Sequence, residues 1–228
     1  MKFIIVGLGN FGSSLGQKLT AHGHEVIGID SSMSKVELYK EKISHTICLD
    51  STDQFAMGGL PLNDADVVIV AIGENQGANI MTTALLKNLN VKRLISRAIT
   101  PLHETVLRAM GVDEIIHPEE ETAERLSKKL LLRGIVDSFD INPEYSIVEV
   151  KVPARYAGKT LEEIGFRRNH NLVVLTTLKI TREKNLLGQI HQVNKVQGVA
   201  SPKTRLNEGD IMVMYGHTSD IKRLLAES

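Results

Sequence analysis

The first 132 residues alternate between short apolar segments and longer segments whose apolar positions repeat with a helical spacing. The short segments are apolar at neighbouring positions, as in strands buried on both faces, and lie at Lys2–Val6, Glu25–Ile29, His45–Leu49, Asp66–Ile72, Arg93–Ser96 and Glu114–His117. The longer segments predict helices at Asn10–His22, Met33–Ile43, Asp53–Leu60, Asn75–Leu89 and Leu102–Met110. This alternation predicts an α/β fold, a doubly wound parallel sheet with helices on both faces.

The pattern changes after one further helix, which Pro118 opens and Gly134 ends. Three glutamates fill its first turn, where the helix dipole favours acidic side chains. Later segments predict strands at Tyr145–Val152, Asn171–Thr177 and Glu208–Tyr215, and a last helix at Ser219–Ala226. Between the last two strands, the polar stretch Lys179–Thr204 is interpreted as an exposed hairpin or a long loop. We therefore expect two domains, the doubly wound one at residues 1–132 and a smaller α+β domain at residues 133–228.

Composition and charge are those of a soluble globular protein. Hydrophobic residues make up 42% of the 228 residues, the formal net charge is zero and the pI is about 7.1. This balance argues against a general nucleic-acid binder and against a polybasic membrane anchor. The longest apolar run, Val67–Ile72, is too short to span a bilayer, and the first residues predict a strand rather than a signal peptide. Any association with a membrane is therefore expected to come through a partner.

The chain has one cysteine, Cys48, which has no second cysteine for an internal disulfide. It lies in an apolar run, so we interpret it as a buried thiol of the third strand. The absence of disulfides fits a reducing, cytoplasmic compartment.

A glycine motif follows the first strand and opens the first helix. It places Gly7, Gly9 and Gly12 so that the first permits a tight turn, the second lets a pyrophosphate approach the backbone and the third lets helix and strand pack closely. Asp30 ends the second strand 18 residues beyond Gly12, near the spacing of about 20 at which an acid binds ribose hydroxyls. The sequence therefore predicts a nucleotide at the N-terminus of this helix.

The ends of other predicted strands face the same crevice, because the carboxyl ends of parallel strands meet at one edge of a sheet. Asp50 follows the third strand and could contact adenine, although Ser51 or Thr52 could also cap the short helix that comes next. Ala71, Ile72 and Gly73 end the fourth strand and predict an apolar wall. Arg97 ends the fifth strand, where its cation can meet a phosphate.

The sequence favours a regulatory protein that senses a bound nucleotide over an enzyme that uses the nucleotide as a reactant. A dehydrogenase needs an acid or base opposite the nicotinamide, and the second domain offers no convergent group of that kind. An NAD-dependent oxidoreductase with a divergent second domain is the alternative.

Several segments together resemble a known family, the cytosolic regulatory subunits of Ktr/Trk potassium uptake systems, which are built from RCK domains. The resemblance covers nearly the whole chain and rests on "FIIVGLGNFGSSL", "HEVIGID", "VVIVAIGENQGANIMTTALLKNL", "MGVDEIIHPEEETAERL", "EYSIVEV" and "LNEGDIMVMYGHTSDIKRL". One nucleotide-binding N-lobe with one C-lobe resembles the Ktr type more than the longer, duplicated Trk type.

The resemblance implies a regulatory subunit that is not an enzyme. Such subunits assemble through dimers into a ring, commonly an octamer, on the cytoplasmic face of a dimeric membrane potassium transporter. Binding of an adenine nucleotide in the N-lobe, with ATP or ADP favoured and NAD(H) or AMP as alternatives, gates potassium flow. In some relatives the C-lobe dimer also binds cyclic di-AMP.

The resemblance also implies roles for individual residues. Asp30 would hold the ribose, Asp50 and Ser51 would contact adenine, and Arg97 and His103 would meet phosphate. Glu119 would bind a Mg²⁺ or Ca²⁺ ion that bridges nucleotide phosphates. The full set implied for the nucleotide is Gly7, Gly9, Asn10, Phe11, Gly12, Asp30, Ser31, Asp50, Ser51, Ala71, Ile72, Gly73, Arg97 and His103.

The glycine loop departs from the family pattern at one position. Asn10 stands where ATP-responsive members usually carry an arginine that reaches the terminal phosphate. A neutral hydrogen bond contributes about 1 kcal/mol and a charged one about 1.5–3 kcal/mol. The substitution therefore reduces the expected preference for ATP over ADP, AMP or NAD.

Overall fold

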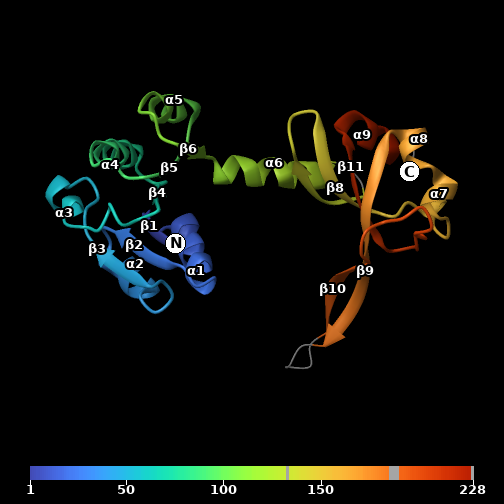
Figure 1. Cartoon of the computed structure of the whole chain (residues 1–228), viewed down its shortest axis with the longest axis horizontal. Coiled ribbons are helices and arrows are strands. Elements are labelled where there is room, and N and C mark those ends of the chain that lie inside the picture. Colours follow the sequence, from blue (N-terminus) through green and yellow to red (C-terminus); the bar gives the residue numbers. More distant parts are fainter. Residues whose placement is uncertain (132–133, 185–189, 227–228) are drawn as a thin grey trace. The chain divides into compact units, whose positions relative to one another are not determined.

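The computed structural model describes residues 1–131, 134–184 and 190–226 (Figure 1). Contacts divide the chain into two compact units, Met1–Glu120 and Glu121–Ser228. The domain boundary that the sequence predicts, between residues 132 and 133, lies outside the described residues. In the described part of the chain, no helix has both the length and the apolar character needed to cross a bilayer.

The first unit is a six-stranded parallel sheet with the strand order β3-β2-β1-β4-β5-β6. This order is that of doubly wound dinucleotide-binding folds: strands are added on one side of β1 up to β3 and on its other side from β4 onward. The strands are β1 (Lys2–Val6), β2 (Glu25–Asp30), β3 (His45–Cys48), β4 (Val67–Val70), β5 (Leu94–Arg97) and β6 (Glu114–Ile116). The helices are α1 (Asn10–Ala21), α2 (Met33–Tyr39), α3 (Gln54–Gly58), α4 (Gln76–Asn88) and α5 (Pro101–Ala109).

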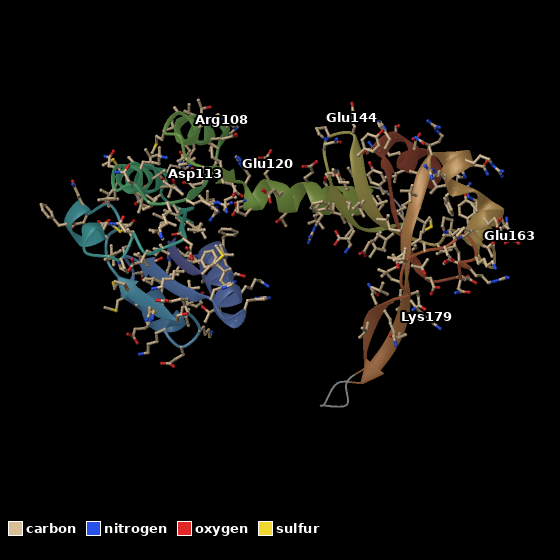
Figure 2. The ribbon with its side chains drawn as sticks, in the orientation of Figure 1. Arg108, Asp113, Glu120, Glu144, Glu163 and Lys179 are labelled. Carbon is tan, nitrogen blue, oxygen red and sulfur yellow. The ribbon has the colours of Figure 1, made fainter. Side chains whose placement is uncertain are left out.

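Both faces of this sheet are apolar, which confirms the prediction from the strand pattern. On β1, Ile4 and Val6 belong to one buried cluster with residues of α3 and α4, whereas Ile5 belongs to another with residues of α1 and α2. On β4, Val68 and Val70 likewise face the first cluster. Successive residues of a strand point to opposite faces, so continuous apolar strands require helices on both sides. Charged side chains such as those of Arg108 and Asp113 lie on the outside (Figure 2).

The second unit contains a five-stranded antiparallel sheet with the order β10-β9-β11-β8-β7. Its core gathers apolar side chains from the strands and from the last helix, among them Val150, Leu172, Met212, Met214 and Leu224. The elements from the end of the first unit onward are α6 (Pro118–Leu131), β7 (Ile135–Asp140), β8 (Tyr145–Lys151), the 3₁₀ helix η1 (Ala154–Tyr156), α7 (Leu161–Ile164), α8 (Phe166–His170), β9 (Leu172–Lys184), β10 (Ile190–Val196), β11 (Ile211–His217) and α9 (Thr218–Ala226).

Two sequence predictions for the first unit are wrong in detail. Cys48 is half-buried rather than buried, because β3 is the edge strand of the sheet and all four of its residues keep some exposure. The short helix after β3 is capped neither by Ser51 nor by Thr52. Its cap is Asp53, whose carboxylate accepts hydrogen bonds from the backbone N–H groups of Phe55 and Ala56.

In the second unit, the polar stretch Lys179–Thr204 includes the paired strands of a hairpin. Strand β9 continues to Lys184 and pairs with β10 in antiparallel register, for example Lys179 with Lys195. Strand β7 was not predicted from the sequence, because it ends in polar residues and alternates weakly. Helices α7 and α8 were not predicted either, because they are too short to show a helical repeat.

Candidate functional site

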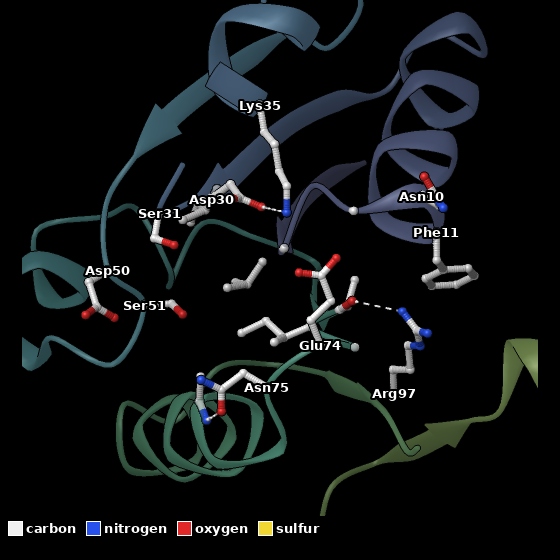
Figure 3. A pocket seen from close by; sticks show the side chains of 18 of the residues that line it. Asn10, Phe11, Asp30, Ser31, Lys35, Asp50, Ser51, Glu74, Asn75 and Arg97 are labelled. Atoms are coloured by element: carbon white, nitrogen blue, oxygen red, sulfur yellow. Dashed lines mark hydrogen bonds and ion pairs between the residues drawn. The ribbon is translucent and has the colours of Figure 1, made fainter. Parts of the chain in front are cut away.

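A cavity of about 340 Å³ opens at the carboxyl ends of the central strands, where the strand order reverses between β1 and β4 (Figure 3). Crevices at this place are where doubly wound sheets bind ligands, and this volume lies in the range of small-molecule sites. The residues that line it come from the first unit alone and are Val6, Gly7, Gly9, Asn10, Phe11, Ile29, Asp30, Ser31, Lys35, Leu49, Asp50, Ser51, Ala71, Ile72, Gly73, Glu74, Asn75, Ala78, Arg97 and Glu119.

The three glycines after β1 have different surroundings. Gly7 has a φ of +100°, and a Cβ atom there would lie 3.0 Å from the backbone nitrogen of Ile72. A Cβ atom on Gly12 would collide with the carbonyl oxygen of Gly7, so this glycine lets α1 pack against the turn. A Cβ atom on Gly9 would meet no atom within 4 Å, so the backbone of Gly9 faces open space in the cavity wall.

The N-terminus of α1 is directed at this open space. Gly9 is the N-cap residue, and no side chain caps the helix. Asn10 and Phe11, the first two helical residues, line the cavity. Unpaired N–H groups and the positive end of the helix dipole make such an N-terminus suited to an anion.

Asp30 connects the end of β2 with the glycine turn. Its carboxylate accepts hydrogen bonds from the backbone nitrogen of Leu8, at 2.8 Å, and from that of Ser32, at 2.9 Å. Lys35, in the first turn of α2, places its Nζ atom 3.7 Å from the same carboxylate. Only 8% of the Asp30 side chain is exposed, so the residue holds the turn in shape as well as facing the cavity.

Asp50 and Ser51 reach the cavity from the loop after β3. Asp50 accepts hydrogen bonds from the backbone nitrogen and the hydroxyl of Thr52, and these hold the pKa of its carboxyl group below the ordinary value. Ser51 is buried, and its hydroxyl lies 2.8 Å from that of Thr82 in α4.

Arg97 ends β5 at the opposite side of the cavity. Its guanidinium forms an ion pair with Glu119, the second residue of α6, and its Nη1 atom lies 3.5 Å from the carbonyl oxygen of Ala71. A Cβ atom on Gly73 would overlap this guanidinium, so the glycine leaves the space that Arg97 occupies. The Nε atom of Arg97 is buried and has no hydrogen-bond partner among the residues that the structure describes.

The structure brings most of the predicted site residues to this one cavity, but two lie elsewhere. Gly12 packs behind the turn, and His103, a residue of α5, is buried and directed at α4, where its Nε2 atom lies 3.2 Å from Oδ1 of Asn79. Burial lowers the pKa of this imidazole, so the neutral form is favoured. His103 thus supports the wall from inside and does not line the cavity.

Sequence reasoning missed several lining residues. Glu74 and Asn75 directly follow Gly73, and their position after β4 could have identified them. Lys35 is five residues beyond Asp30, in the first turn of the next helix, a position from which a side chain can reach back to the strand end. The other missed residues are Val6, Ile29, Leu49 and Ala78.

The charges that line the cavity are unbalanced. Four acidic side chains, Asp30, Asp50, Glu74 and Glu119, face two basic ones, Lys35 and Arg97. Figure 3 shows the carboxylate of Glu74 directed into the cavity. In the described part of the chain, no group of three or more His, Cys, Asp and Glu side chains could hold a metal ion by itself.

Comparison with known proteins identifies the family of this chain. Residues 3–118 match the model of the TrkA-N domain. The chain belongs to the TrkA-N domain family. It is 34% identical to the Ktr system potassium uptake protein C of Bacillus subtilis (strain 168), over 97% of this chain and 95% of that protein. It is 30% identical to the Ktr system potassium uptake protein A of the same organism, over 97% of this chain and 94% of that protein.

Solved structures show the same fold for this TrkA-N family chain. The RCK domain of GsuK superposes with a TM-score of 0.64 at 19% identity, over 99% of this chain and 47% of that one. The GsuK channel bound to NAD superposes with a TM-score of 0.63 at 19% identity, over 96% of this chain and 38% of that one. The chain thus spans less than half the length of these proteins, and the likeness concerns the fold.

Proposed function

We propose that this chain is the regulatory subunit of a potassium uptake system and that it binds an adenine nucleotide in the cavity at the ends of β1 and β4. The observation that carries the proposal is the arrangement of that cavity. The uncapped N-terminus of α1 and the open backbone at Gly9 suit phosphate groups, and the buried carboxylate of Asp30 suits ribose hydroxyls.

The two sides of the cavity suit different parts of a nucleotide. The loop after β3, with Asp50 and Ser51, would face the adenine, and Arg97 would meet the phosphates with charge-assisted hydrogen bonds. ADP and ATP fit these features, and so do AMP and NAD(H). Asn10 brings no charge, so the preference for ATP is expected to be weak.

A divalent cation fits the same site. The excess of carboxylates would repel phosphates unless a cation lay between them, and Mg²⁺ commonly combines one or two carboxylates with phosphate oxygens. Glu119 and Glu74 are the lining carboxylates that hold no backbone turn, and of these Glu119 is the expected ligand.

The nucleotide acts as a signal in this proposal, and the chain is not an enzyme. The relatives that share nearly the full length are named as potassium uptake proteins, which supports a partnership with a membrane potassium transporter. The chain would then lie at the cytoplasmic face of the membrane and assemble with copies of itself into a ring. The oxidoreductase is the competing function, because the same fold also serves dehydrogenases.

One experiment separates the two functions. Purified protein is incubated with ADP, ATP, AMP and NADH with and without Mg²⁺, binding is measured by calorimetry, and the recovered nucleotide is identified by mass spectrometry. The proposal expects binding and unchanged nucleotide.

In parallel, the chain is co-expressed with a Ktr membrane subunit in bacteria that lack potassium uptake, and growth at low potassium is expected to depend on both proteins. Oxidation of NADH in the presence of small carbonyl compounds, or growth that does not need this chain, would contradict it.

A further inference from the structure

Helix α4 carries three polar side chains that have no exposure to solvent. Asn79, Thr82 and Thr83 are each 0% exposed, although none of them lines the cavity. Buried polar groups cost free energy unless they are hydrogen-bonded, and threonine within a helix adds no helical stability. The hydrogen-bond partners of these three side chains therefore indicate which parts of the structure the side chains hold in place.

Asn79 joins the ends of two neighbouring strands. Its Nδ2 atom donates to the carbonyl oxygen of Ile72, at 2.9 Å, and to that of Arg97, at 3.1 Å. These two donations fix the orientation of the amide, so Oδ1 is left to accept from Ser96, at 3.1 Å, and from His103, at 3.2 Å. Every hydrogen-bonding atom of this side chain is used. Asn79 thus fixes the backbone directly before Gly73 and at the base of the Arg97 side chain.

Thr82 lies three residues further along the same face of α4 and holds a different part of the cavity. Its hydroxyl shares a hydrogen bond of 2.8 Å with that of Ser51, which follows β3 and is 8% exposed. One rigid helix therefore fixes the Arg97 side of the cavity through Asn79 and the Ser51 side through Thr82.

We propose that Asn79 and Thr82 are positioning residues with separable effects on the ligand, Asn79 on its phosphates and Thr82 on its nucleoside. This inference rests on the proposed nucleotide site. The guanidinium of Arg97 packs directly against Gly73, where there is no room for a Cβ atom. Its position therefore depends on the backbone of Ile72 and of Arg97, to which Asn79 is hydrogen-bonded. Binding groups need this kind of support to keep a productive geometry. The hydroxyl of Ser51 depends in the same way on Thr82.

The test compares two buried variants, Asn79→Ala and Thr82→Val, with the wild type. Calorimetry gives the Kd of adenosine, AMP and ADP for each protein, and the ratio of the adenosine Kd to the ADP Kd measures the contribution of the phosphates. We expect Asn79→Ala to reduce this ratio about tenfold or more, the amount that one charged hydrogen bond supplies, with little change for adenosine. We expect Thr82→Val to weaken all three ligands by a common factor and to leave the ratio unchanged.

General destabilisation cannot imitate the reduced ratio expected for Asn79→Ala, because it would weaken the three ligands alike and leave the ratio unchanged. If Asn79→Ala does not fold, Asn79→Leu replaces it, since leucine has a similar size, carries no charge and donates to neither carbonyl. A wild-type ratio in the folded Asn79 variant, or equal losses of the ratio in both variants, would overturn the inference. A wild-type protein that binds none of the three ligands would contradict the proposed function itself and the inference with it.

Discussion

Arg97 and Glu119 form an ion pair at the rim of the cavity, between the end of β5 and the first turn of α6. Arg97 is the expected phosphate ligand and Glu119 the expected cation ligand, so each neutralises the other in the absence of a nucleotide. Arg97 is mostly buried, with 14% of its side chain exposed, whereas Glu119 is 65% exposed. Glu119 is therefore the partner that is free to move when phosphate takes its place beside Arg97.

This pairing predicts opposite effects of Glu119→Gln with and without divalent cations. Without them, the variant is expected to bind ADP about two- to tenfold more tightly, because Arg97 is released and a repelling carboxylate is removed. With Mg²⁺, the strengthening of ADP binding that we expect for the wild type should be absent in the variant. Calorimetric titration of ADP at several Mg²⁺ concentrations measures both effects.

Glu121→Gln provides the matched control for this prediction, because Glu121 lies in the same helical turn and does not line the cavity. It should behave as the wild type under both conditions. By linkage, ADP should raise the affinity for Mg²⁺ by the same factor by which Mg²⁺ raises that for ADP. An undiminished effect of Mg²⁺ in Glu119→Gln would leave Glu119 with no more than its favourable position at the N-terminus of α6.

Asp30→Ala is expected to reduce both stability and nucleoside binding. The buried N–H group of Leu8 loses its acceptor, which costs about 1–3 kcal/mol of the free energy of unfolding. Asp30→Asn keeps one acceptor and should lose less stability, yet it should still bind adenosine more weakly than the wild type. Chemical denaturation and calorimetry measure the two properties.

For the loss of stability at Asp30, Asp50→Ala is the control. Asp50 is exposed, and among the described residues its carboxylate bonds only to Thr52, so its removal should change the free energy of unfolding by less than about 0.5 kcal/mol. Equal stability of Asp30→Ala and wild type would show that the carboxylate does not support the glycine turn.

The glycine turn predicts a contrast between two alanine variants. Gly12→Ala should destabilise the first unit by about 2 kcal/mol or more, because the methyl group collides with the backbone carbonyl of Gly7. Gly9→Ala should keep the melting temperature, because its φ of −69° suits alanine and the added Cβ atom meets nothing. It should nevertheless weaken ADP binding, since that open space is the expected path of the phosphates. A Gly9→Ala protein with wild-type affinity would place the phosphates elsewhere.

His103 predicts a component of the pH dependence of stability. Burial lowers the pKa of its imidazole in the folded protein, so the unfolded chain binds a proton more readily near its ordinary value of 6.5. The contribution of His103 is then complete above about pH 6.5 and is lost as the pH falls towards the lower pKa of the folded state.

We therefore expect the wild type to lose more unfolding free energy than His103→Gln between pH 7 and pH 5. Glutamine can keep the donor to Asn79 without titrating. His45→Gln, which alters an exposed histidine of β3, should retain the wild-type profile. Parallel denaturation curves of wild type and His103→Gln across this range would show that His103 titrates as it does in the unfolded chain.

The sequence by itself determined the fold of the first unit and the core of the candidate site. Strands such as β4 are apolar at every position, and such strands are stable only with helices on both faces. Gly7, Gly9 and Gly12 have spacings that a tight strand-to-helix turn requires, and Asp30 ends the next strand. These signals are local: each depends on residues within one strand and the turn that follows it.

Tertiary structure alone decided which side chains meet across the cavity. Glu119 stands 22 residues beyond Arg97, and their pairing depends on where α6 begins relative to the end of β5. His103 points inward to Asn79 because α5 packs beside α4, and the hydrophobic repeat of a helix does not show which helix lies next to it. Cys48 keeps part of its exposure because β3 became the edge strand. Contacts between elements follow from how helices and strands pack, and the pattern along the chain reports only the face that each element buries.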